Sequence, residues 1–295
     1  MTGECILAID FGGTKVALAR ATATDVRLGD VLRLPTRPTA GADQVVRRSF
    51  KAARRLLAAP DAVGVSTFGV VRGDRIRLAP NVPGWDGLEL PRLLREEFGA
   101  IPVAIGNDVK AAALAELRWG ALQGVDVGIY LNLGTGLATA LVVDGAVVRG
   151  AHGAAGEIGY VLGSAGEPGF ADGRAPLEEV VSGAALAARG SQLLGRPVTA
   201  YDLFALRDDP AVGRLLDDAV AAMAMVVANL CITLDPERVV VGGGMMRAAR
   251  HILPRISAEV AQAVPFPPAI QPARFVDDAS LLGAFALALE ACGLP

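Results

Sequence analysis

Cysteine is scarce in this chain of 295 residues, and the three cysteines, at positions 5, 231 and 292, lie far apart in the sequence. An odd number of widely separated cysteines argues against a disulfide framework and against a zinc cluster of the C-x-x-C kind. The pattern is typical of proteins from a reducing compartment. We therefore expect a cytoplasmic protein that has no structural zinc.

Aromatic residues, charge of one sign and long apolar runs are also limited. Aromatic residues make up 5% of the chain, which leaves little for stacking against single-stranded nucleic acid. The 28 basic and 31 acidic residues give a net charge of −3, which argues against a basic nucleic-acid-binding surface. The longest apolar run, 219–228, is about half of the ~20 residues that a membrane-spanning helix needs. The sequence thus predicts that the chain binds neither nucleic acid nor a membrane.

Glycine, in contrast, is abundant, and apolar residues are numerous enough to fill a large core. Glycine accounts for 35 residues and apolar residues for 52% of the chain. Because domains average roughly 150 residues, the length predicts two domains or lobes. Hydrophobic periodicity predicts strands at 5–9, 16–19, 31–34, 62–66, 103–108, 126–133, 137–143 and at the start of 238–246, and helices at 43–59 (with Asp43 as N-cap), 90–98, 109–121, 209–234 and 279–292.

Two segments of the chain resemble each other. AIDFGGTKVALA at 8–19 aligns with YLNLGTGLATAL at 130–141 at an offset of 122 residues, so Asp10 corresponds to Asn132. Each segment reads as a strand, a glycine turn and a second strand, followed by units of helix and strand. This pattern predicts two lobes of related structure with a cleft between them.

Three glycine turns are candidates for nucleotide binding. In DFGGTK at 10–15, the glycine pair lets backbone N–H groups approach a phosphate, Thr14 offers a hydroxyl, and Asp10 can hold Mg²⁺ through water. LGTG at 133–136 would be a second phosphate loop, and GGG at 242–244 would support the sugar and base of a nucleotide. The alternative interpretations are an ordinary hairpin turn and a tight strand-to-helix turn.

Polar residues at strand ends and in apolar surroundings are candidates for catalysis or sugar binding. Asn107 and Asp108 end a predicted strand, where a carboxylate can accept a proton from a hydroxyl that attacks a phosphoryl group. Alternatively, Asp108 only caps the following helix. Glu157 lies in an apolar, glycine-rich stretch. Because burying a carboxylate is costly, a polyol ligand is one sensible hydrogen-bond partner for it, and a turn or helix-cap carboxylate is the alternative.

Several short strings follow one another over about 6–289. They are AIDFGGTKVALA, PNVPGW, GND, LGTG, GAHGAAGEIG, LE followed shortly by SG, VVGGGM and DDASLLGAFALAL. Their order resembles the ROK family of sugar kinases, within the actin, hexokinase and Hsp70-like ATPase superfamily. GAHGAAGEIG is the most diagnostic string, whereas the first marks only the superfamily. The resemblance implies an α/β, two-lobed fold of two related mixed sheets with flanking helices, in which 1–108 plus 279–295 form the small lobe and 109–278 the large one.

The resemblance also implies a role for each matching residue. Asp108 would be the general base that takes the proton of the sugar 6-hydroxyl. The residues that would contact the sugar are Asn107, Glu157, Glu178, Tyr160, Asn81 and Gly69. The residues that would hold ATP, with Mg²⁺ near Asp10, are Asp10, Gly12, Gly13, Thr14, Lys15, Gly134, Thr135, Gly136, Gly242, Gly243 and Gly244.

The chain departs from the family pattern in its sugar-binding loop. Relatives usually read GEIGH followed by C-x-C-G-x-x-G-C, whose Cys and His bind a structural zinc. Here Tyr160 replaces that His, and 163–176 contains no cysteine, so the resemblance implies that zinc is absent. If Tyr160 reaches the sugar beside the acceptors Glu157 and Glu178, an amino sugar is favoured. If Tyr160 only fills space, glucose remains the substrate.

The function implied by the resemblance is an ATP- and Mg²⁺-dependent kinase that phosphorylates the 6-hydroxyl of glucose or of an aminodeoxyglucose such as kanosamine. One alternative is a kinase for N-acetylmannosamine or another hexose. Another is a sugar-sensing ROK protein without catalysis, although a first strand that begins by Cys5 leaves no room for a DNA-binding helix-turn-helix. The string at 150–159 disfavours an actin-like assembly protein. A homodimer is expected because it is common in the family.

Overall fold

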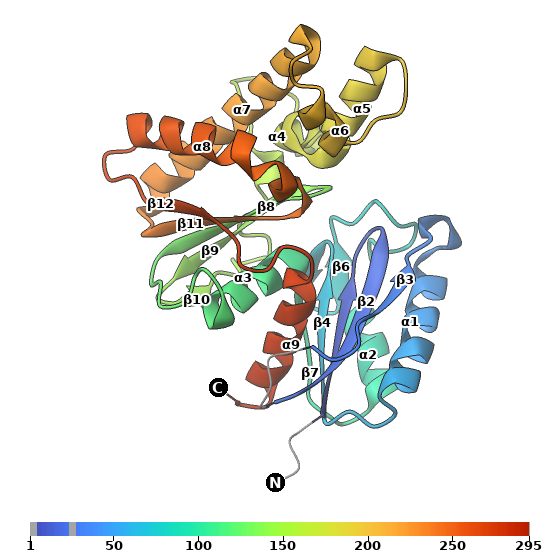
Figure 1. Ribbon diagram of the computed structural model, residues 1–295. Helices are drawn as coiled ribbons and strands as arrows, with labels where there is room; N and C mark the ends of the chain where they lie inside the picture. The colour runs from blue at the N-terminus through green and yellow to red at the C-terminus, as the bar shows by residue number, and fades with distance from the viewer. Residues whose placement is uncertain (1–4, 24–27, 295) are drawn as a thin grey trace. The chain divides into compact units, whose positions relative to one another are not determined.

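The computed structural model describes residues 5–23 and 28–294 and divides the chain into two compact units. Unit 1 consists of Met1–Arg118, Arg149–Ala154 and Asp278–Pro295, and unit 2 consists of Trp119–Val148 and Ala155–Asp277. Each unit contains a five-stranded sheet with helices packed against it (Figure 1). The short segment Arg149–Ala154 thus belongs to unit 1, although both of its neighbours along the chain belong to unit 2.

The strands of unit 1 are β1 (Cys5–Phe11), β2 (Lys15–Thr22), β3 (Leu32–Pro35), β4 (Ala62–Thr67), β5 (Val70–Arg72), β6 (Arg75–Arg77) and β7 (Val103–Asn107). The main sheet has the order β3-β2-β1-β4-β7, and β5 and β6 form a separate hairpin. β1, β2 and β3 form an antiparallel meander, whereas β4 and β7 run parallel to β1.

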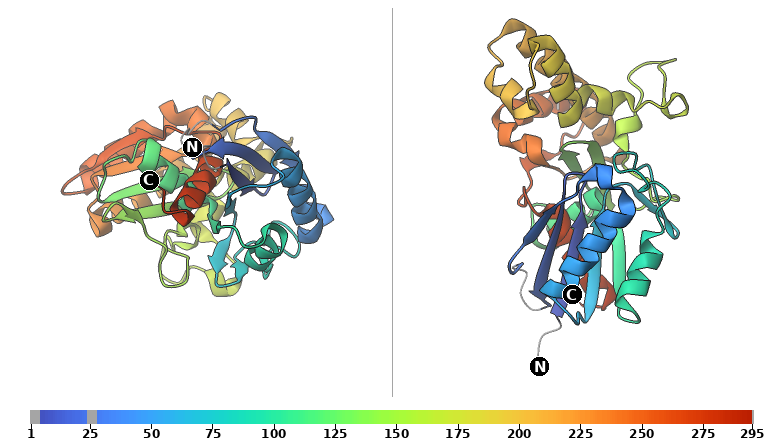
Figure 2. Two further views of the ribbon diagram at one scale, coloured as in Figure 1. Left: turned by 90° about the horizontal axis from the view of Figure 1, so that it is seen from below. Right: turned by 90° about the vertical axis from the view of Figure 1, so that its right-hand side faces the viewer.

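Helices cover both faces of this sheet. They are α1 (Ala42–Leu56), α2 (Leu90–Phe98), α3 (Asp108–Trp119) and α9 (Ala279–Ala291), with a 3-10 turn η1 (Pro38–Ala40) before α1. Val63 and Val65 of β4 lie in the apolar core that α1 and α2 complete, whereas Gly64 contacts α9. Because alternate residues of a strand point to opposite faces, α9 covers the face opposite to α1 and α2, as Figures 1 and 2 show.

The strands of unit 2 are β8 (Gly128–Leu133), β9 (Leu137–Val143), β10 (Ala146–Val147), β11 (Arg238–Gly242) and β12 (Ala269–Pro272). Its helices are α4 (Pro176–Val181), α5 (Gly183–Leu194), α6 (Ala200–Ala205), α7 (Pro210–Leu234) and α8 (Ala249–Ala263), with 3-10 turns η2 (Ile158–Tyr160), η3 (Phe170–Asp172) and η4 (Gly244–Ala248). Ile129, Leu131 and Leu133 of β8 point into a core that they share with α4, α5, α7 and α8.

The two sheets repeat one topology, which confirms the internal duplication predicted from the sequence. The sheet of unit 2 has the order β10-β9-β8-β11-β12, again an antiparallel meander followed by two parallel strands. The aligned residues occupy matching places: Asp10 of β1 pairs with Ala17, and Asn132 of β8 pairs with Ala138. The two glycine turns therefore begin at the same end of the same central strand.

Four of the five predicted helices differ from the observed ones by one to three residues at one or both ends. The N-cap of α1 is Gly41 and not Asp43, because the chain leaves η1 with a positive φ of 81° at Gly41. Asp43 lies in the first turn instead, where a carboxylate still interacts favourably with the helix dipole. α3 starts at Asp108, one residue earlier than predicted.

α7 is a long and unusually apolar helix. Among the described residues it is the one helix whose length and composition would allow it to cross a membrane, and half of its most apolar window is buried inside unit 2. Met223, Val227 and Cys231 point into the core of that unit. One face of α7 is thus apolar because it packs into the core of unit 2.

The close contact between Gly64 and α9 leads to a testable prediction. A Cβ on Gly64 would lie 1.7 Å from the carbonyl oxygen of Ala284 in α9, a contact that no rotamer change can relieve. We expect Gly64→Ala to destabilise the protein by about 3 kcal/mol or more, because the backbone of α9 must move away. Denaturant unfolding measures this, with Gly73→Ala as the control. At Gly73 a Cβ meets open space and only the positive φ of 57° is strained. Equal losses in the two variants would contradict the prediction.

Candidate functional site

The first glycine turn joins β1 to β2 in unit 1. The Gly12 N–H donates to the Lys15 carbonyl at 3.0 Å, and a Cβ on Gly12 would lie 2.7 Å from the same oxygen. Gly12 is therefore needed by the hairpin itself. A Cβ on Gly13 would meet nothing within 4 Å, and Thr14 and Lys15 are exposed. The open side of the turn is thus formed by Gly13, Thr14 and Lys15.

Asp10 lies just before this turn, and its carboxylate accepts a hydrogen bond from Ser66 Oγ at 2.7 Å. Burial raises the pKa of Asp10 from 3.8 to about 6; the Ser66 hydrogen bond and the charge of Lys15 oppose this rise, and the charge of Asp278 adds to it. The ionised carboxylate is therefore only partly stabilised within unit 1. A divalent cation, which prefers such oxygen ligands, would stabilise it further.

Asn107, the last residue of β7, has a side chain that is fixed by three hydrogen bonds. Its Oδ1 accepts from the backbone N–H groups of Val109 and Lys110 at 3.0 and 3.1 Å, and its Nδ2 donates to the Gly69 carbonyl at 2.9 Å. Asn107 is thus the residue that caps α3. The half-buried Asp108 adds one contact, in which its Oδ1 accepts from the N–H of Val109 at 2.9 Å. The cap therefore rests mainly on Asn107.

Gly69 and Asn81 are placed differently from each other. Gly69 has a φ of 80°, and a Cβ there would lie 2.7 Å from the carbonyl oxygen of Arg77. Its role in the structure is to bring its carbonyl to Asn107. Asn81 is exposed, in a segment anchored by the buried Trp85, whose Nε1 donates to Thr67 Oγ1 at 3.1 Å.

The second glycine turn, between β8 and β9, is attached to the start of α5 in unit 2. The carbonyls of Gly134 and Thr135 accept hydrogen bonds from the N–H groups of Gly183 and Ala184 at 3.0 and 3.1 Å. A Cβ on Gly183 would lie 2.7 Å from the Gly134 carbonyl oxygen. The turn and the helix terminus are thus held together by backbone contacts that glycine permits.

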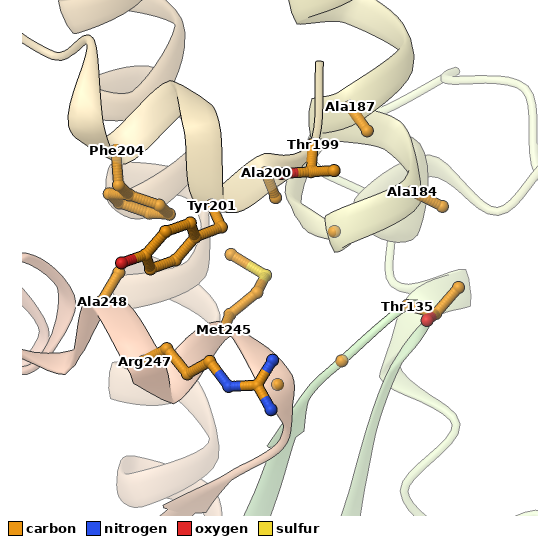
Figure 3. A pocket seen from close by; sticks show the side chains of 13 residues that line it. Thr135, Ala184, Ala187, Thr199, Ala200, Tyr201, Phe204, Met245, Arg247 and Ala248 are labelled. Atoms are coloured by element: carbon orange, nitrogen blue, oxygen red, sulfur yellow. The ribbon is translucent and has the colours of Figure 1, made fainter. Parts of the chain in front are cut away.

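A pocket of about 290 Å³ opens beside this turn, within unit 2 (Figure 3). Its walls come from the turn, from the first turns of α5 and α6, and from η4. The lining residues are Gly134, Thr135, Gly183, Ala184, Ala187, Thr199, Ala200, Tyr201, Phe204, Gly244, Met245, Arg247 and Ala248. In Figure 3 the ring of Tyr201 and the side chain of Arg247 lie on the side of η4. Small residues and flat apolar side chains suit a planar ring system.

The third glycine turn contributes one residue to this pocket. A Cβ on Gly242 would lie 2.3 Å from Tyr130 Oη, and a Cβ on Gly243, with its φ of 89°, would lie 2.5 Å from the Leu133 carbonyl. Both glycines are thus required by close packing against β8. A Cβ on Gly244 would meet nothing within 4 Å, and Gly244 lines the pocket together with Gly134 and Thr135.

Glu157 and Glu178 lie beside β9 in unit 2. Glu178 Oε2 accepts from the N–H of Leu137 at 2.8 Å, and a Cβ on Gly136 would lie 2.9 Å from the same oxygen. Gly136 is therefore small because the Glu178 carboxylate packs against it. Gly156, with a φ of 84°, approaches the backbone of Thr139 so closely that the neighbouring Glu157 is held next to the strand.

Tyr160 lies at the end of η2, close to both carboxylates. Burial and the negative charges of Glu178 and Glu157 all raise the pKa of its phenol. Its ring also meets the ring of Phe170 edge-to-face, with centroids 5.4 Å apart. Phe170 belongs to the segment 163–176, in which this chain lacks the family's cysteines. Within 5–23 and 28–294, no group of three or more His, Cys, Asp or Glu residues could hold a metal ion.

A model of the ROK family matches residues 6–291. The chain belongs to the ROK family. It is 32% identical to the kanosamine kinase of Amycolatopsis mediterranei (96% of this chain, 95% of the relative) and 31% identical to the N-acetylmannosamine kinase of Citrobacter koseri (96% and 98%). A crystal structure of a ROK family glucokinase from Streptomyces griseus in complex with glucose and AMPPNP matches with a TM-score of 0.81 at 26% identity (97% and 99%).

These matches confirm the resemblance seen in the sequence and the actin/hexokinase-like ATPase fold of this ROK protein. They also confirm that it is an enzyme of the sugar-kinase class. Of the residues singled out in the sequence, Gly69, Asn107 and Asp108 are adjacent in unit 1. In unit 2, Gly134, Thr135 and Gly244 share a pocket, and Glu157, Glu178 and Tyr160 form a second group.

Sequence reasoning missed most of the pocket wall in this ROK protein. Tyr201, Phe204 and Arg247 carry no motif, and the small residues Ala184 and Ala187 look like ordinary helix residues. One signal was present: Thr199 begins a capping box with Asp202, which marks the start of α6 at the pocket. Ser66, the hydrogen-bond partner of Asp10, was also missed, because β1 and β4 are far apart in the sequence.

Prediction of the pH dependence of Asp10. Because its folded pKa of about 6 exceeds 3.8, the folded state binds the proton more tightly than the unfolded chain. Ionisation therefore lowers the stability of the ligand-free protein as the pH rises from about 4 to 6. We expect Asp10→Asn to raise the free energy of unfolding by about 1–3 kcal/mol at pH 7.5, with the gain vanishing near pH 4. Denaturant titrations at both pH values measure this; a gain that is the same at both would contradict it.

Proposed function

We propose that this protein transfers the γ-phosphoryl group of ATP to the 6-hydroxyl of a hexose, either glucose or an aminodeoxyglucose such as kanosamine. The observation that carries the proposal is the junction of β7 and α3. There Asn107 takes over the main capping contacts, and Asp108 stands at the carboxyl end of a parallel strand. A carboxylate in this position is placed to accept a proton rather than required to hold a helix.

In the proposed mechanism, Asp108 accepts the proton of the sugar hydroxyl while that oxygen forms a bond to the γ-phosphorus and the bond to the β-γ bridging oxygen breaks. The products are the sugar phosphate and ADP, and the proton rests on Asp108 until it passes to solvent. Phosphoryl transfer depends on positioning and charge stabilisation more than on covalent chemistry. The other residues of the site therefore need only to orient the two reactants.

For the nucleotide, we propose that the pocket of unit 2 holds the adenosine and that the Gly134–Thr135–Gly136 turn holds phosphates. Gly13, Thr14 and Lys15 are proposed as a second set of phosphate contacts, because they form the open side of the first turn. Asp10 fits Mg²⁺ as a ligand through water, since its carboxylate is only partly stabilised in unit 1. Mg²⁺ bound with ATP supplies neutralisation of the charge on the transferred phosphate.

For the sugar, we propose Asn107, Glu157, Glu178 and Tyr160 as the main contacts, with Asn81 and Gly69 nearby. Asn107 keeps one Nδ2 hydrogen beyond the one donated to Gly69, and this hydrogen can reach a hydroxyl. Glu178 has one carboxylate oxygen engaged with Leu137, which leaves the other for the ligand. Gly69 contributes by orienting Asn107.

The two carboxylates beside Tyr160 favour an amino sugar, because an ammonium group is the strongest donor that a hexose can offer them. The 32% identity to a kanosamine kinase points in the same direction. The contact between Tyr160 and Phe170 supports the alternative, in which Tyr160 fills the space of the family's zinc loop and glucose is the substrate. We also propose a cytoplasmic location, which the cysteine pattern supports, and a homodimer, which the family supports.

Prediction for the catalytic base. We expect Asp108→Asn to fold, to bind sugar and to lose kcat by about 10²–10⁴-fold, the usual effect of removing a general base. Coupled ADP-release kinetics give kcat, and a thermal shift with sugar gives binding. Asp86→Asn, an exposed residue of the same unit, is the matched control. A near-parental kcat in the Asp108 variant would remove it from the mechanism.

Prediction for the substrate. We expect kcat/KM for an aminodeoxyglucose to equal or exceed that for glucose, because one charge-assisted hydrogen bond contributes about 1.5–3 kcal/mol. The assay compares glucose, kanosamine, glucosamine and N-acetylmannosamine. Glu157→Gln, which removes one negative charge, should reduce the activity on the amino sugar more than that on glucose. A preference of more than about tenfold for glucose over every amino sugar would refute the amino-sugar hypothesis and leave the kinase assignment standing.

A further inference from the structure

A second large cavity lies in unit 1, between β3 and α1. Its volume is about 680 Å³, within the usual range of small-molecule sites. Its residues come from the sequence segments 30–37 and 48–56, none of which belongs to the proposed sugar or nucleotide contacts. We call it the β3–α1 groove.

The rim of the β3–α1 groove is strongly basic. Arg37, Arg48, Lys51 and Arg55 line it, against a single acidic residue, Asp30. None of these four basic side chains forms an ion pair within the described part of the chain. By contrast, other arginines of unit 1 pair with acids, among them Arg33, Arg54, Arg75, Arg77, Arg92 and Arg95. In a chain with a net charge of −3, this local excess of positive charge favours an anion.

One of the basic side chains is held in place by backbone carbonyls. Arg48 donates through Nη2 to the carbonyls of Pro35 at 3.2 Å and Thr36 at 2.7 Å, which directs it toward the groove wall. Arg37 has a φ of 53°, a left-handed conformation that is strained for a residue with a side chain. Strain of this kind persists where the surrounding structure fixes the backbone, and the exposed Arg37 lines the groove.

The floor of the groove is apolar. Leu34, Ala52 and Leu56 form part of it, and Leu32 is 38% exposed although it is a large hydrophobic residue in a strand. An inorganic ion would leave this surface in contact with water. A ligand that combines an apolar body with one or more anionic groups would cover the floor and neutralise the rim.

We infer that the β3–α1 groove is a binding site for an amphiphilic organic anion, such as an aromatic or aliphatic phosphate. None of its residues is among those proposed for phosphoryl transfer, although Pro35 pairs with Lys15 of the first glycine turn. Arg48 supplies a positive charge that hydrogen bonds hold in place, and the exposed Arg37, Lys51 and Arg55 supply mobile ones.

The test uses the full chain with saturating AMPPNP, so that the nucleotide pocket is blocked, and titrates it with the fluorescent anion 8-anilinonaphthalene-1-sulfonate. We expect saturable binding that weakens about tenfold or more in the double variant Lys51→Glu/Arg55→Glu. The control is Arg47→Glu/Arg72→Glu, which changes net charge equally at exposed residues outside the groove and should shift the Kd less than about twofold. Arg48 is left unchanged, because it supports Thr36.

A competition arm identifies the ligand class. We expect 1-naphthyl phosphate to displace the fluorescent anion at concentrations at least about tenfold lower than pyrophosphate does, since only the former covers the apolar floor. Equal displacement by both would overturn the amphiphilic class. Equal affinity of the parent and both double variants, or no saturable binding at all, would overturn the site.

Discussion

The hydrogen bonds of the Asn107 side chain fix the junction on which the proposed chemistry depends. One side chain ends β7, caps α3 and binds the carbonyl of Gly69, so strand, helix and the turn before β5 meet at a single amide. Such a junction leaves little freedom to the backbone of Asp108. Proton transfer tolerates errors of only a few tenths of an ångström, and a base on a rigid strand-to-helix junction meets that demand better than one on a free loop.

The duplicated halves have kept one backbone and exchanged the chemistry placed on it. Where unit 1 has Asp10, unit 2 has Asn132. The carboxylate has a raised pKa and a partner in Ser66, whereas the amide packs between Gly134 and Gly243, with its atoms 3.2 and 2.9 Å from where their Cβ atoms would be. A carboxylate at this position can bind a cation. A neutral amide packed among glycines adds no negative charge, so the backbone N–H groups of the turn can bind an anion.

Patterns of apolar residues predicted eight strands of the two main sheets and five helices, but they missed α4, α5, α6 and α8. The fold class itself followed from the family resemblance. The duplication followed from two aligned strings, and α2 was predicted at its observed bounds. Capping by Asp108 was the alternative to its catalytic role, and the structure gives it one such contact, whereas Asn107 makes two. The groove could not be predicted, because nothing in the sequence shows that β3 lies beside the basic residues of α1. Contacts of this kind depend on chain segments that meet only in the fold.

The loop at 163–176 is held in this structure by several weak contacts. A structural zinc contributes about 10–16 kcal/mol in small domains, whereas an edge-to-face pair of rings contributes about 0.5–1.5 kcal/mol. The Tyr160–Phe170 contact is therefore one of several weak ones, joined by the hydrogen bonds of Glu167 to the N–H groups of Gly163 and Ser164 and by the Arg174–Glu179 ion pair. Phe170 is 65% exposed, so it restrains the ring of Tyr160 from one side only. Because Phe170 of the loop packs against Tyr160, the position of the phenol beside Glu157 and Glu178 depends on the conformation of the loop. Under the proposed function, a change in the packing of this loop would alter how Glu157 and Glu178 meet the sugar.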